Sequence, residues 1–148
     1  MEERFQTFTL LIANIGRNIR KIKSGEMAEY NLKSQHVSCL YYIYKAKSIT
    51  AKELCDLCDE DKANISRSVK FLEERGYLKC DTKLTKRYLS PLELTESGVA
   101  IAKSIGERID EVLIQSGDGI TDTELCGFYK CLGIINDRLQ KIAEQYDK

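Results

Sequence analysis

A short segment that begins at Lys62 carries side chains suited to contact with a nucleic acid. Asn64, Ser66 and Arg67 follow closely, and Lys70 comes one helical turn further on. An asparagine can pair with an adenine edge, and an arginine with a guanine edge, through two hydrogen bonds each. Serine and lysine side chains can also reach phosphate oxygens. The residue types and their spacing therefore predict recognition of double-stranded DNA.

Electric charge is distributed unevenly along the chain. The formal net charge is zero, but residues 62–91 carry +5 and residues 92–148 carry −5. A polyanion responds to the local charge within a screening length of about 10 Å and not to the total. The basic stretch includes Lys83, Lys86 and Arg87, which we expect at the tip of a hairpin, in reach of the DNA backbone or an adjacent minor groove. Taken alone, the stretch is also compatible with a solvated surface that has no partner.

Six cysteines raise the question of metal or thiol chemistry. Cys55 and Cys58 form a Cys-x-x-Cys pair, which is either a zinc or dithiol site or a part of the core. A structural zinc site needs four ligands, and the sequence offers no second pair of this kind and a single histidine, His36. Core packing is therefore favoured, and Cys39 and Cys80 are the candidates for a redox-sensing thiol. We predict no catalytic residue, metal site or cofactor, because no catalytic triad, paired carboxylates or Gly-rich phosphate loop is recognisable.

Apolar residues recur with the period of an α-helix at both ends of the chain. The N-terminal stripe consists of Phe5, Phe8, Ile12, Ile15, Ile19 and Ile22. The C-terminal stripe consists of Leu125, Phe128, Leu132, Ile135, Leu139 and Ile142. With shorter apolar patterns between them, these stripes predict six helices, over residues 4–23, 35–46, 51–58, 62–75, 95–115 and 122–146.

The elements between the two stripes must position the candidate DNA contacts. Thr50 and Glu53 form a capping box, in which each side chain bonds to the backbone N–H of the other residue, and Thr121 and Glu124 form a second one before the C-terminal stripe. A short helix, a turn at Glu60–Asp61 and a second helix that ends at Gly76 then match a helix-turn-helix. In that motif the second helix enters the major groove. The start of the first helix favours a nearby phosphate, which adds Thr50 and Lys52 to the predicted contacts.

Two β-strands are predicted after the helix-turn-helix. They span residues 77–80 and 88–94, and the polar stretch between them forms the turn. Pro91 has no backbone donor, so the second strand must lie at an edge or contain a bulge. The predicted fold class is mainly α with a small β-wing: a winged helix-turn-helix with six helices and a two- to three-stranded hairpin.

Three segments, in order, resemble the MarR family of bacterial transcription regulators. Asp61–Arg67 is similar to the start of that family's recognition helix, Leu72–Leu78 to the junction of this helix with the wing, and Leu94–Gly98 to the Leu-Thr-x-x-Gly signature that closes the wing. The similarity covers residues 32–98, and the flanking helices match by arrangement. It adds Ala63, which lies in the first segment, to the expected DNA contacts.

The resemblance implies a homodimer whose first and last helices interlock around a two-fold axis. The implied interface residues come from the two apolar stripes: Phe5, Phe8, Ile12, Ile15, Leu125, Phe128, Leu132, Ile135 and Leu139. Two recognition helices would then meet successive major grooves of a pseudo-palindromic operator. The chain is accordingly divided into an N-terminal dimerisation helix and loop (1–32), a DNA-binding lobe (33–95) and C-terminal dimerisation helices (96–148).

In the resembled family, effectors often bind between the dimer helices and the DNA-binding lobe, near the second helix. The resemblance places His36, Tyr41 and Tyr44 in such a pocket. Tyrosines suit an aromatic ligand, but they also suit a plain core, and for His36 a place on the surface of a helix is favoured over the pocket. The function that follows is that of a repressor released from its operator by a small ligand or an oxidant.

Two alternatives come from other classes of protein. One is a thiol- or metal-dependent protein that uses Cys55 and Cys58, and the other is a winged-helix module that binds protein instead of DNA. The expected partners are double-stranded DNA, a second copy of the chain and a small-molecule effector. No membrane partner and a cytoplasmic location are expected, because the sequence has neither an apolar run long enough to span a bilayer nor the pattern of a signal peptide.

Overall fold

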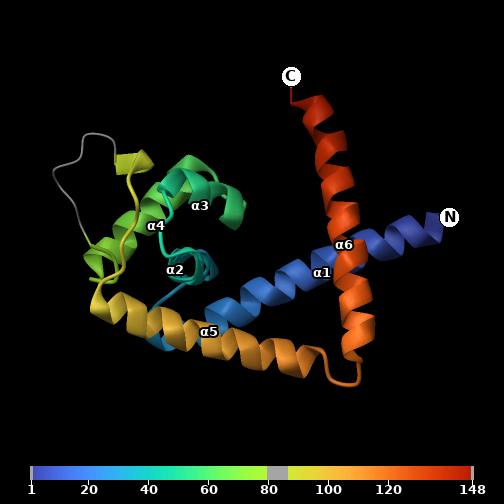
Figure 1. Cartoon of the computed structure of the whole chain (residues 1–148), viewed down its shortest axis with the longest axis horizontal. Coiled ribbons are helices and arrows are strands. Elements are labelled where there is room, and N and C mark those ends of the chain that lie inside the picture. Colours follow the sequence, from blue (N-terminus) through green and yellow to red (C-terminus); the bar gives the residue numbers. More distant parts are fainter. Residues whose placement is uncertain (1, 80–86, 148) are drawn as a thin grey trace. The chain divides into compact units, whose positions relative to one another are not determined.

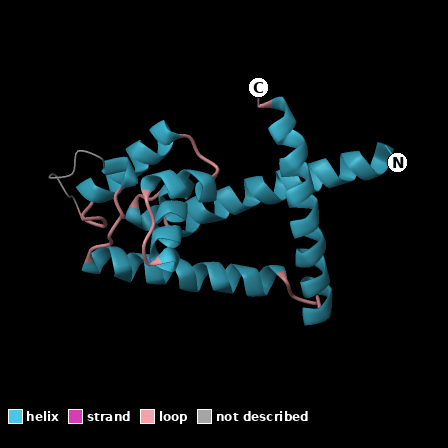
Figure 2. Cartoon of the chain, turned by 45° about the horizontal axis from the view of Figure 1, so that its top comes forward, coloured by secondary structure: helices cyan, strands magenta, loops and turns pink. Residues whose placement is uncertain are grey.

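The computed structural model describes residues 2–79 and 87–147 and consists almost entirely of helices (Figures 1 and 2). Six α-helices follow one another in these residues: α1 (Glu2–Glu26), α2 (Ser34–Ala46), α3 (Ala51–Cys58), α4 (Lys62–Glu74), α5 (Glu96–Ser116) and α6 (Asp122–Ala143). Three single-turn 3₁₀ helices accompany them: η1 (Ala28–Tyr30), η2 (Arg87–Leu89) and η3 (Glu144–Tyr146). The six predicted α-helices are confirmed, with ends that shift by a few residues.

The chain forms two compact units, Met1–Ile109 and Asp110–Lys148. The first unit holds α1 to α4 and the first part of α5, and the second holds the rest of α5 together with α6. Over the described ranges, no helix combines the length and the apolar character needed to cross a membrane. The division at residues 1–32, 33–95 and 96–148 stays a prediction.

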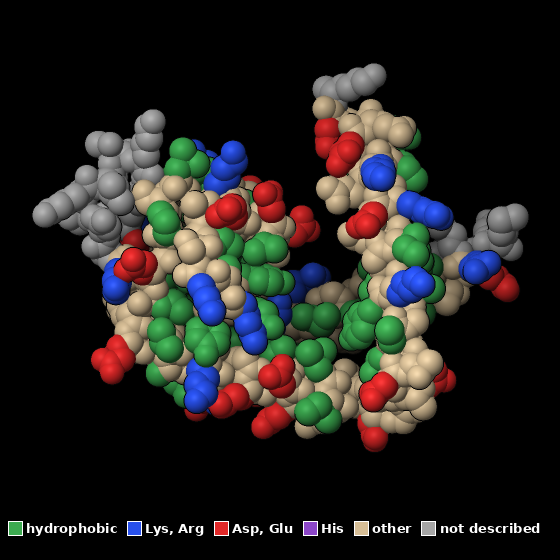
Figure 3. Space-filling view, in the orientation of Figure 1, with side chains coloured by type: hydrophobic (Ala, Val, Ile, Leu, Met, Phe, Trp, Pro, Cys, Tyr) green, Lys and Arg blue, Asp and Glu red, His purple; other side chains and the backbone are tan. Residues whose placement is uncertain are grey.

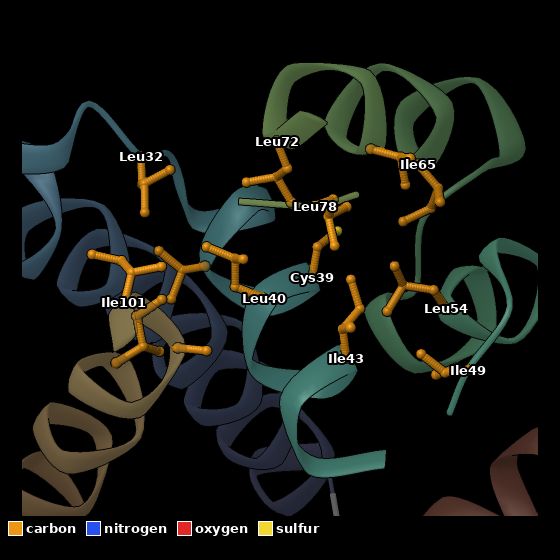
Figure 4. Packing of buried hydrophobic residues seen from close by; sticks show 14 of the residues in the cluster. Leu32, Cys39, Leu40, Ile43, Ile49, Leu54, Ile65, Leu72, Leu78 and Ile101 are labelled. Carbon is orange, nitrogen blue, oxygen red and sulfur yellow. The ribbon is translucent and has the colours of Figure 1, made fainter. Parts of the chain in front are cut away.

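An apolar cluster around α2 holds the first unit together (Figure 4). In this cluster Cys39, Leu40 and Ile43 of α2 lie with Leu54 of α3 and Leu72 of α4. Burial of one aliphatic side chain stabilises a fold by about 1.5–3 kcal/mol. The helical period of the apolar residues therefore gathers α3 and α4, the two helices of the helix-turn-helix, around α2 (Figure 1).

The predicted loop over residues 24–32 is largely helical. α1 continues to Glu26, and η1 follows it directly. The predicted end of the first helix at residue 23 is wrong, because Met27 and Leu32 on either side of η1 are buried in the core. This burial outweighs the roughly 1 kcal/mol that Gly25 costs within the helix. An ion pair between Nη1 of Arg108 in α5 and the Glu26 carboxylate (3.4 Å) holds the end of α1 against α5.

The base of the predicted wing is present as two isolated antiparallel bridges. Leu78 pairs with Leu94, and Thr50 pairs with Pro91. Pro91 has no backbone N–H to donate. The backbone N–H of Leu92 donates instead, to the carbonyl of Ile49 over 2.8 Å. The tip, residues 80–86, lies outside the described residues, so the complete hairpin stays a prediction.

The predicted second strand begins too early. Residues 87–89 form η2, because Tyr88 turns toward the helix-turn-helix. Its hydroxyl lies 3.3 Å from the Sγ atom of Cys55 in α3, and Nζ of Lys62 in α4 lies 4.6 Å from the centre of its ring. A cation over an aromatic face is attracted to it. These contacts hold Tyr88 against both helices and replace the extended strand predicted at this point.

His36 is buried, so its interpretation as a residue of the helix surface is wrong. Its side chain is only 6% exposed, and its ring stacks on that of Phe71 in α4 with the ring centres 4.1 Å apart. Its Nδ1 atom accepts a hydrogen bond from the backbone N–H of Lys33 over 3.1 Å. Burial, followed by the positive charge of Lys33, lowers the pKa of His36. The imidazole is therefore neutral at neutral pH.

This burial predicts a loss of stability in mild acid. Because the pKa of His36 is lower in the folded chain than in the unfolded chain, the unfolded state takes up the proton first, and stability falls as the pH drops through about 6.5. We expect the free energy of unfolding in urea to fall between about pH 7.5 and about pH 5.5 in the wild-type chain. It should fall less in His36→Gln, and an equal fall in both proteins would contradict the prediction. His36 is the only histidine, so no other imidazole contributes.

The second unit is dominated by α6. Its N-terminus carries the second predicted capping box, which is confirmed: the Thr121 hydroxyl accepts from the backbone N–H of Glu124 (3.3 Å), and the Glu124 carboxylate accepts from the N–H of Thr121 (2.9 Å). Gly119 makes the preceding turn with a φ of 80°, which glycine adopts without strain. None of the residues of α6 is buried, and hydrophobic side chains lie on the surface of this unit (Figure 3). The apolar stripe of α6 is thus uncovered in the single chain.

Candidate nucleic-acid interface

Local interactions define the ends of the two helices of the helix-turn-helix. The Thr50 hydroxyl accepts from the backbone N–H of Glu53 (3.2 Å), and the Glu53 carboxylate accepts from the N–H of Thr50 (2.8 Å), which confirms the predicted capping box. The bond from the Thr50 backbone, followed by the one from its hydroxyl, lowers the pKa of Glu53. After α3, Asp59 adopts a left-handed conformation (φ 51°), which aspartate tolerates better than most residues. Asp61 then caps α4 by accepting from the N–H of Asn64 over 2.7 Å.

α4 has one buried face and one exposed face. The buried face consists of Ile65, Ser68, Val69 and Leu72. The exposed face carries most of the predicted DNA contacts of this helix: Lys62, Ala63, Ser66, Arg67 and Lys70. Because side chains three and four residues apart share a face, the structure brings these groups together on the side of α4 that points away from the core.

Asn64 is placed differently from the other predicted contacts. It is half-buried, its Nδ2 atom donates to the Glu60 carboxylate over 2.9 Å, and its Oδ1 atom accepts from the Arg67 guanidinium. Both ends of the amide therefore have a partner within the protein, and the predicted contact with an adenine would use the second N–H of Nδ2 and the second lone pair of Oδ1. Sequence reasoning missed the role of Glu60. Its spacing of four residues from Asn64 is the signal that could have found it, since such residues are neighbours on a helical turn.

The lysines of the candidate DNA interface make different kinds of interaction within the protein. Lys62 lies over the ring of Tyr88, whereas Nζ of Lys70 lies 3.8 Å from Oε1 of Glu74 in a largely exposed pair. An exposed pair of this kind contributes at most about 1 kcal/mol, so Lys70 can exchange it for a phosphate. Lys52, near the start of α3, is exposed as well.

The DNA contacts predicted for the tip of the wing lie largely outside the described residues. Lys83 and Lys86 lie outside the described residues, and so does the side chain of Arg87. At the base of the wing, Nζ of Lys79 pairs with the Glu93 carboxylate over 2.8 Å. This ion pair links the two sides of the wing base, and the contacts of the tip stay a prediction.

The Leu94–Gly98 signature joins the start of α5 to the turn that follows α4. The Thr95 hydroxyl donates to the backbone carbonyl of Gly76 and accepts from the N–H of Gly98, the latter over 3.1 Å. A Cβ atom added to Gly98 would overlap the backbone carbonyl of Tyr77. The glycine is therefore required by close backbone approach, and the signature fixes the end of the helix that carries the candidate DNA contacts.

Two cavities lie near the residues predicted to line an effector pocket, and neither of the two is lined by all three residues. Tyr41 lines a cavity of about 160 Å³ that Lys23 and Ser38 also line. Tyr44 lines a different, open hollow of about 440 Å³, and His36 lines neither of these two. The effector pocket stays a prediction, for which the cavity at Tyr41 is the more enclosed candidate.

The residues predicted for the dimer interface lie on uncovered helix faces. In α1, Ile12 and Ile15 are 42% and 48% exposed. In α6, Phe128 and Leu139 are 51% and 52% exposed. The remaining residues of this prediction are partly exposed, namely Phe8, Leu125, Leu132 and Ile135, apart from Phe5, whose side chain lies outside the described part. Long exposed apolar rows mark surfaces that bind a partner.

Cys55 and Cys58 lie on α3, one helical turn apart. The Cys55 thiol donates to the backbone carbonyl of Ala51 over 3.3 Å, and its Sγ atom lies 3.3 Å from the Tyr88 hydroxyl. Both lie half-buried against the core cluster, in agreement with the core-packing interpretation. In residues 2–79 and 87–147, no group of three or more metal-ligating side chains is placed to hold an ion, so the metal alternative finds no ligand set there.

The geometry of α3 and α4 defines the class of this protein. Two helices joined by a tight turn pack against a third, and the second helix of the pair shows a polar and basic face to solvent. This is the arrangement of a helix-turn-helix DNA-binding protein. Residues 30–87, which contain both helices, match the sequence model of the MarR family. This part of the chain is therefore similar in sequence to the MarR family.

Solved structures with this fold include several MarR-family proteins. A MarR family regulator from Neisseria meningitidis superimposes with a TM-score of 0.74 at 19% identity, over 98% of this chain and 97% of its own. A MarR transcriptional regulator from Methanosarcina mazei Go1 gives 0.80 at 19% identity, over 93% and 92%. The reduced form of MarR from E. coli gives 0.68 at 17% identity, over 86% and 94%. At these identities the likeness establishes the fold. No curated protein matches the chain in sequence.

Proposed function

We propose that this chain binds specific DNA sequences as a homodimer and represses transcription from a pseudo-palindromic operator. The observation that carries the proposal is the division of α4 into a buried apolar face and an exposed face with Lys62, Ser66, Arg67 and Lys70. An α-helix fits the major groove, where base edges present distinct patterns of donors and acceptors. Arg67 supplies base recognition, and the lysines supply attraction to phosphate.

Dimerisation follows from the uncovered apolar rows of α1 and α6. Ile12, Ile15, Phe128 and Leu139 each leave roughly half of their surface in water. A second copy of the chain offers the same rows in the same order, which suits a self-complementary two-fold interface. A dimer places two copies of α4 in related orientations, and two half-sites in the DNA then mirror the symmetry of the protein.

Release from DNA is assigned to a small ligand or an oxidant. The cavity at Tyr41 is lined by Lys23 of α1, Ser38 of α2 and Ile109 of α5. A ligand there touches both the helix proposed for dimerisation and the helix that supports the DNA-binding lobe. Such a ligand shifts DNA affinity to the extent that it binds the DNA-bound and the free forms unequally.

Salt dependence of DNA binding tests the electrostatic part of this function. If Lys52, Lys62 and Lys70 of each subunit neutralise phosphates, a dimer releases counterions from about six sites. The affinity for a DNA duplex should then fall roughly 10³-fold between about 50 and about 200 mM salt. Fluorescence anisotropy with labelled duplexes selected from a random library, read over a salt series, measures this slope.

Two controls make the salt experiment decisive. Lys70→Ala should flatten the slope, whereas Lys141→Ala, in the last turn of α6, should leave it unchanged. Sedimentation of the free protein should give the mass of two chains. Weak, salt-insensitive DNA binding at low salt would instead favour the alternative of a winged-helix module that binds protein.

A further inference from the structure

Three polar side chains at the start of α4 are joined in a row by hydrogen bonds. Nδ2 of Asn64 donates to the Glu60 carboxylate over 2.9 Å. Oδ1 of the same amide accepts from Nη2 of Arg67. Spacings of four and three residues are those of neighbours on the surface of a helix. This polar row therefore links Glu60, in the turn after α3, to the arginine that is proposed to recognise a base.

The chemistry of the two outer groups fixes the orientation of the amide between them. A carboxylate only accepts hydrogen bonds, and a guanidinium only donates them. The amide of Asn64 must therefore turn its nitrogen toward Glu60 and its oxygen toward Arg67. Hydrogen bonds in such a chain polarise and strengthen one another. Without the carboxylate, the bond to Arg67 is the only one of the two that still orients the amide.

The turn holds Glu60 in place independently of the polar row. The backbone N–H of Glu60 donates to the Cys55 carbonyl over 3.1 Å, directly after the left-handed bend at Asp59. The cap of α4 is supplied by Asp61, which accepts from the backbone N–H of Asn64 over 2.7 Å. Since α4 is capped by another residue, the carboxylate of Glu60 holds a side chain in position and not the start of the helix.

The outer end of the polar row is a long side chain that would otherwise be free to move. Glu60 and Asn64 are half-buried, whereas Arg67 is exposed. The bond to Asn64 uses one of the five N–H groups of the guanidinium, so enough remain for the two bonds to a guanine edge. Ordering a long side chain on binding lowers an affinity by a factor of about 2–12. An arginine that is already ordered in the free protein avoids part of this loss, but only for DNA that suits its orientation.

The charge of Glu60 acts on DNA binding in the opposite direction. Its carboxylate lies between Asp59 and Asp61 in the turn that leads into the candidate DNA-binding face of α4. Negative groups at this place repel the phosphates of any duplex, whatever its sequence. The same side chain thus weakens general attraction to DNA and orients the group that recognises a base.

We propose that Glu60 is a positioning residue of the DNA interface, which orients Arg67 through the amide of Asn64 and thereby raises sequence discrimination while it lowers the affinity for DNA in general. The two hydrogen bonds of the polar row, with their fixed direction, carry the proposal. It rests on the proposed function and identifies a residue that sets the specificity of the same site.

Asp59 and Glu60 offer a matched set of variants. Asp59→Asn removes one negative charge from the same turn, takes no part in the two bonds of the Asn64 amide, and suits the left-handed backbone there. Glu60→Ala removes the same charge together with the bond to Asn64. Glu60→Gln removes the charge but keeps an oxygen that can accept this bond.

The experiment measures the affinity of each full-length variant for a selected duplex and for a scrambled duplex by fluorescence anisotropy. Asp59→Asn and Glu60→Ala should both bind the scrambled duplex more tightly than the wild type, by similar factors. The ratio of the two affinities should fall at least about fivefold in Glu60→Ala, because a dimer orders two copies of Arg67. It should stay near the wild-type value in Asp59→Asn and fall less in Glu60→Gln than in Glu60→Ala.

A second measurement separates positioning of Arg67 from a general effect on the fold. Each base pair of the selected duplex is replaced in turn, and the loss of affinity is compared between the wild type and Glu60→Ala. The variant should lose preference at one guanine in each half-site and keep it at the other positions. An even loss at all positions, or equal falls of the ratio in Asp59→Asn and Glu60→Ala, overturns the proposal.

The wild-type chain distinguishes the two ways in which the experiment can fail. If it binds the selected and the scrambled duplex equally, the proposed function is wrong, and the role of Glu60 fails with it. If the wild type discriminates between the duplexes and Glu60→Ala discriminates as well as the wild type, the proposed function stands and only the role of Glu60 is refuted.

Discussion

Arg67→Ala is expected to abolish sequence-specific DNA binding and to leave the dimer and the fold intact. Arg67 is exposed on the outer face of α4, so its removal leaves no cavity in the core. A two-bond contact between arginine and a guanine edge contributes about 1–3 kcal/mol of discrimination. A dimer carries the residue twice, so the loss should reach about 2–6 kcal/mol, which is roughly a 30-fold or larger drop in affinity.

The measurement is a pair of titrations, one with a selected duplex and one with a duplex of scrambled sequence. Arg67→Ala should bring the first affinity close to the second. Arg67→Lys keeps the charge but not the two-pronged geometry, so it should retain binding to both duplexes and lose most of the difference between them. Full affinity of Arg67→Ala for the selected duplex would refute the assignment of α4 as the reading helix.

Gly98→Ala is expected to cause the largest loss of stability of the glycine-to-alanine substitutions in this chain. The new Cβ atom would overlap the backbone carbonyl of Tyr77, and a backbone atom has no rotamer with which to move aside. The Tyr77 carbonyl also accepts the N–H of Thr95 over 3.0 Å, so a shift that relieves the overlap breaks this bond. Overpacking of a rigid site costs about 1–3 kcal/mol, and occasionally more, and we expect the upper end of that range.

Gly106→Ala is the control for that substitution. Gly106 lies in the same helix, is buried as well, and has no atom within 4 Å of the position of an added Cβ. Alanine favours a helix over glycine by about 1 kcal/mol, so this variant should be as stable as the wild type or more stable. Urea unfolding of the three proteins measures the contrast. Equal stability of Gly98→Ala and Gly106→Ala would show that the turn after α4 yields to the added group.

The sequence determined the features that depend on residues three or four positions apart. The caps at Thr50 and Thr121 form as predicted, because both partners lie within one helical turn. The division of α4 into an apolar side with Ile65 and Leu72 and a polar side with Arg67 follows from the helical period. The motifs between residues 61 and 98 likewise predicted the similarity to the MarR family that residues 30–87 show, because these motifs lie close together along the chain.

The tertiary structure alone decided which side chains meet across different helices. The stacking of His36 on Phe71 joins α2 to α4, and the contact of the Cys55 sulfur with the Tyr88 hydroxyl joins α3 to η2. Neither pair has a fixed spacing in the sequence, since it arises only when the apolar faces of three helices pack around one core. Local patterns set the direction in which each side chain leaves its own helix. What lies opposite depends on how the helices pack, and packing sums the contacts of many side chains at once.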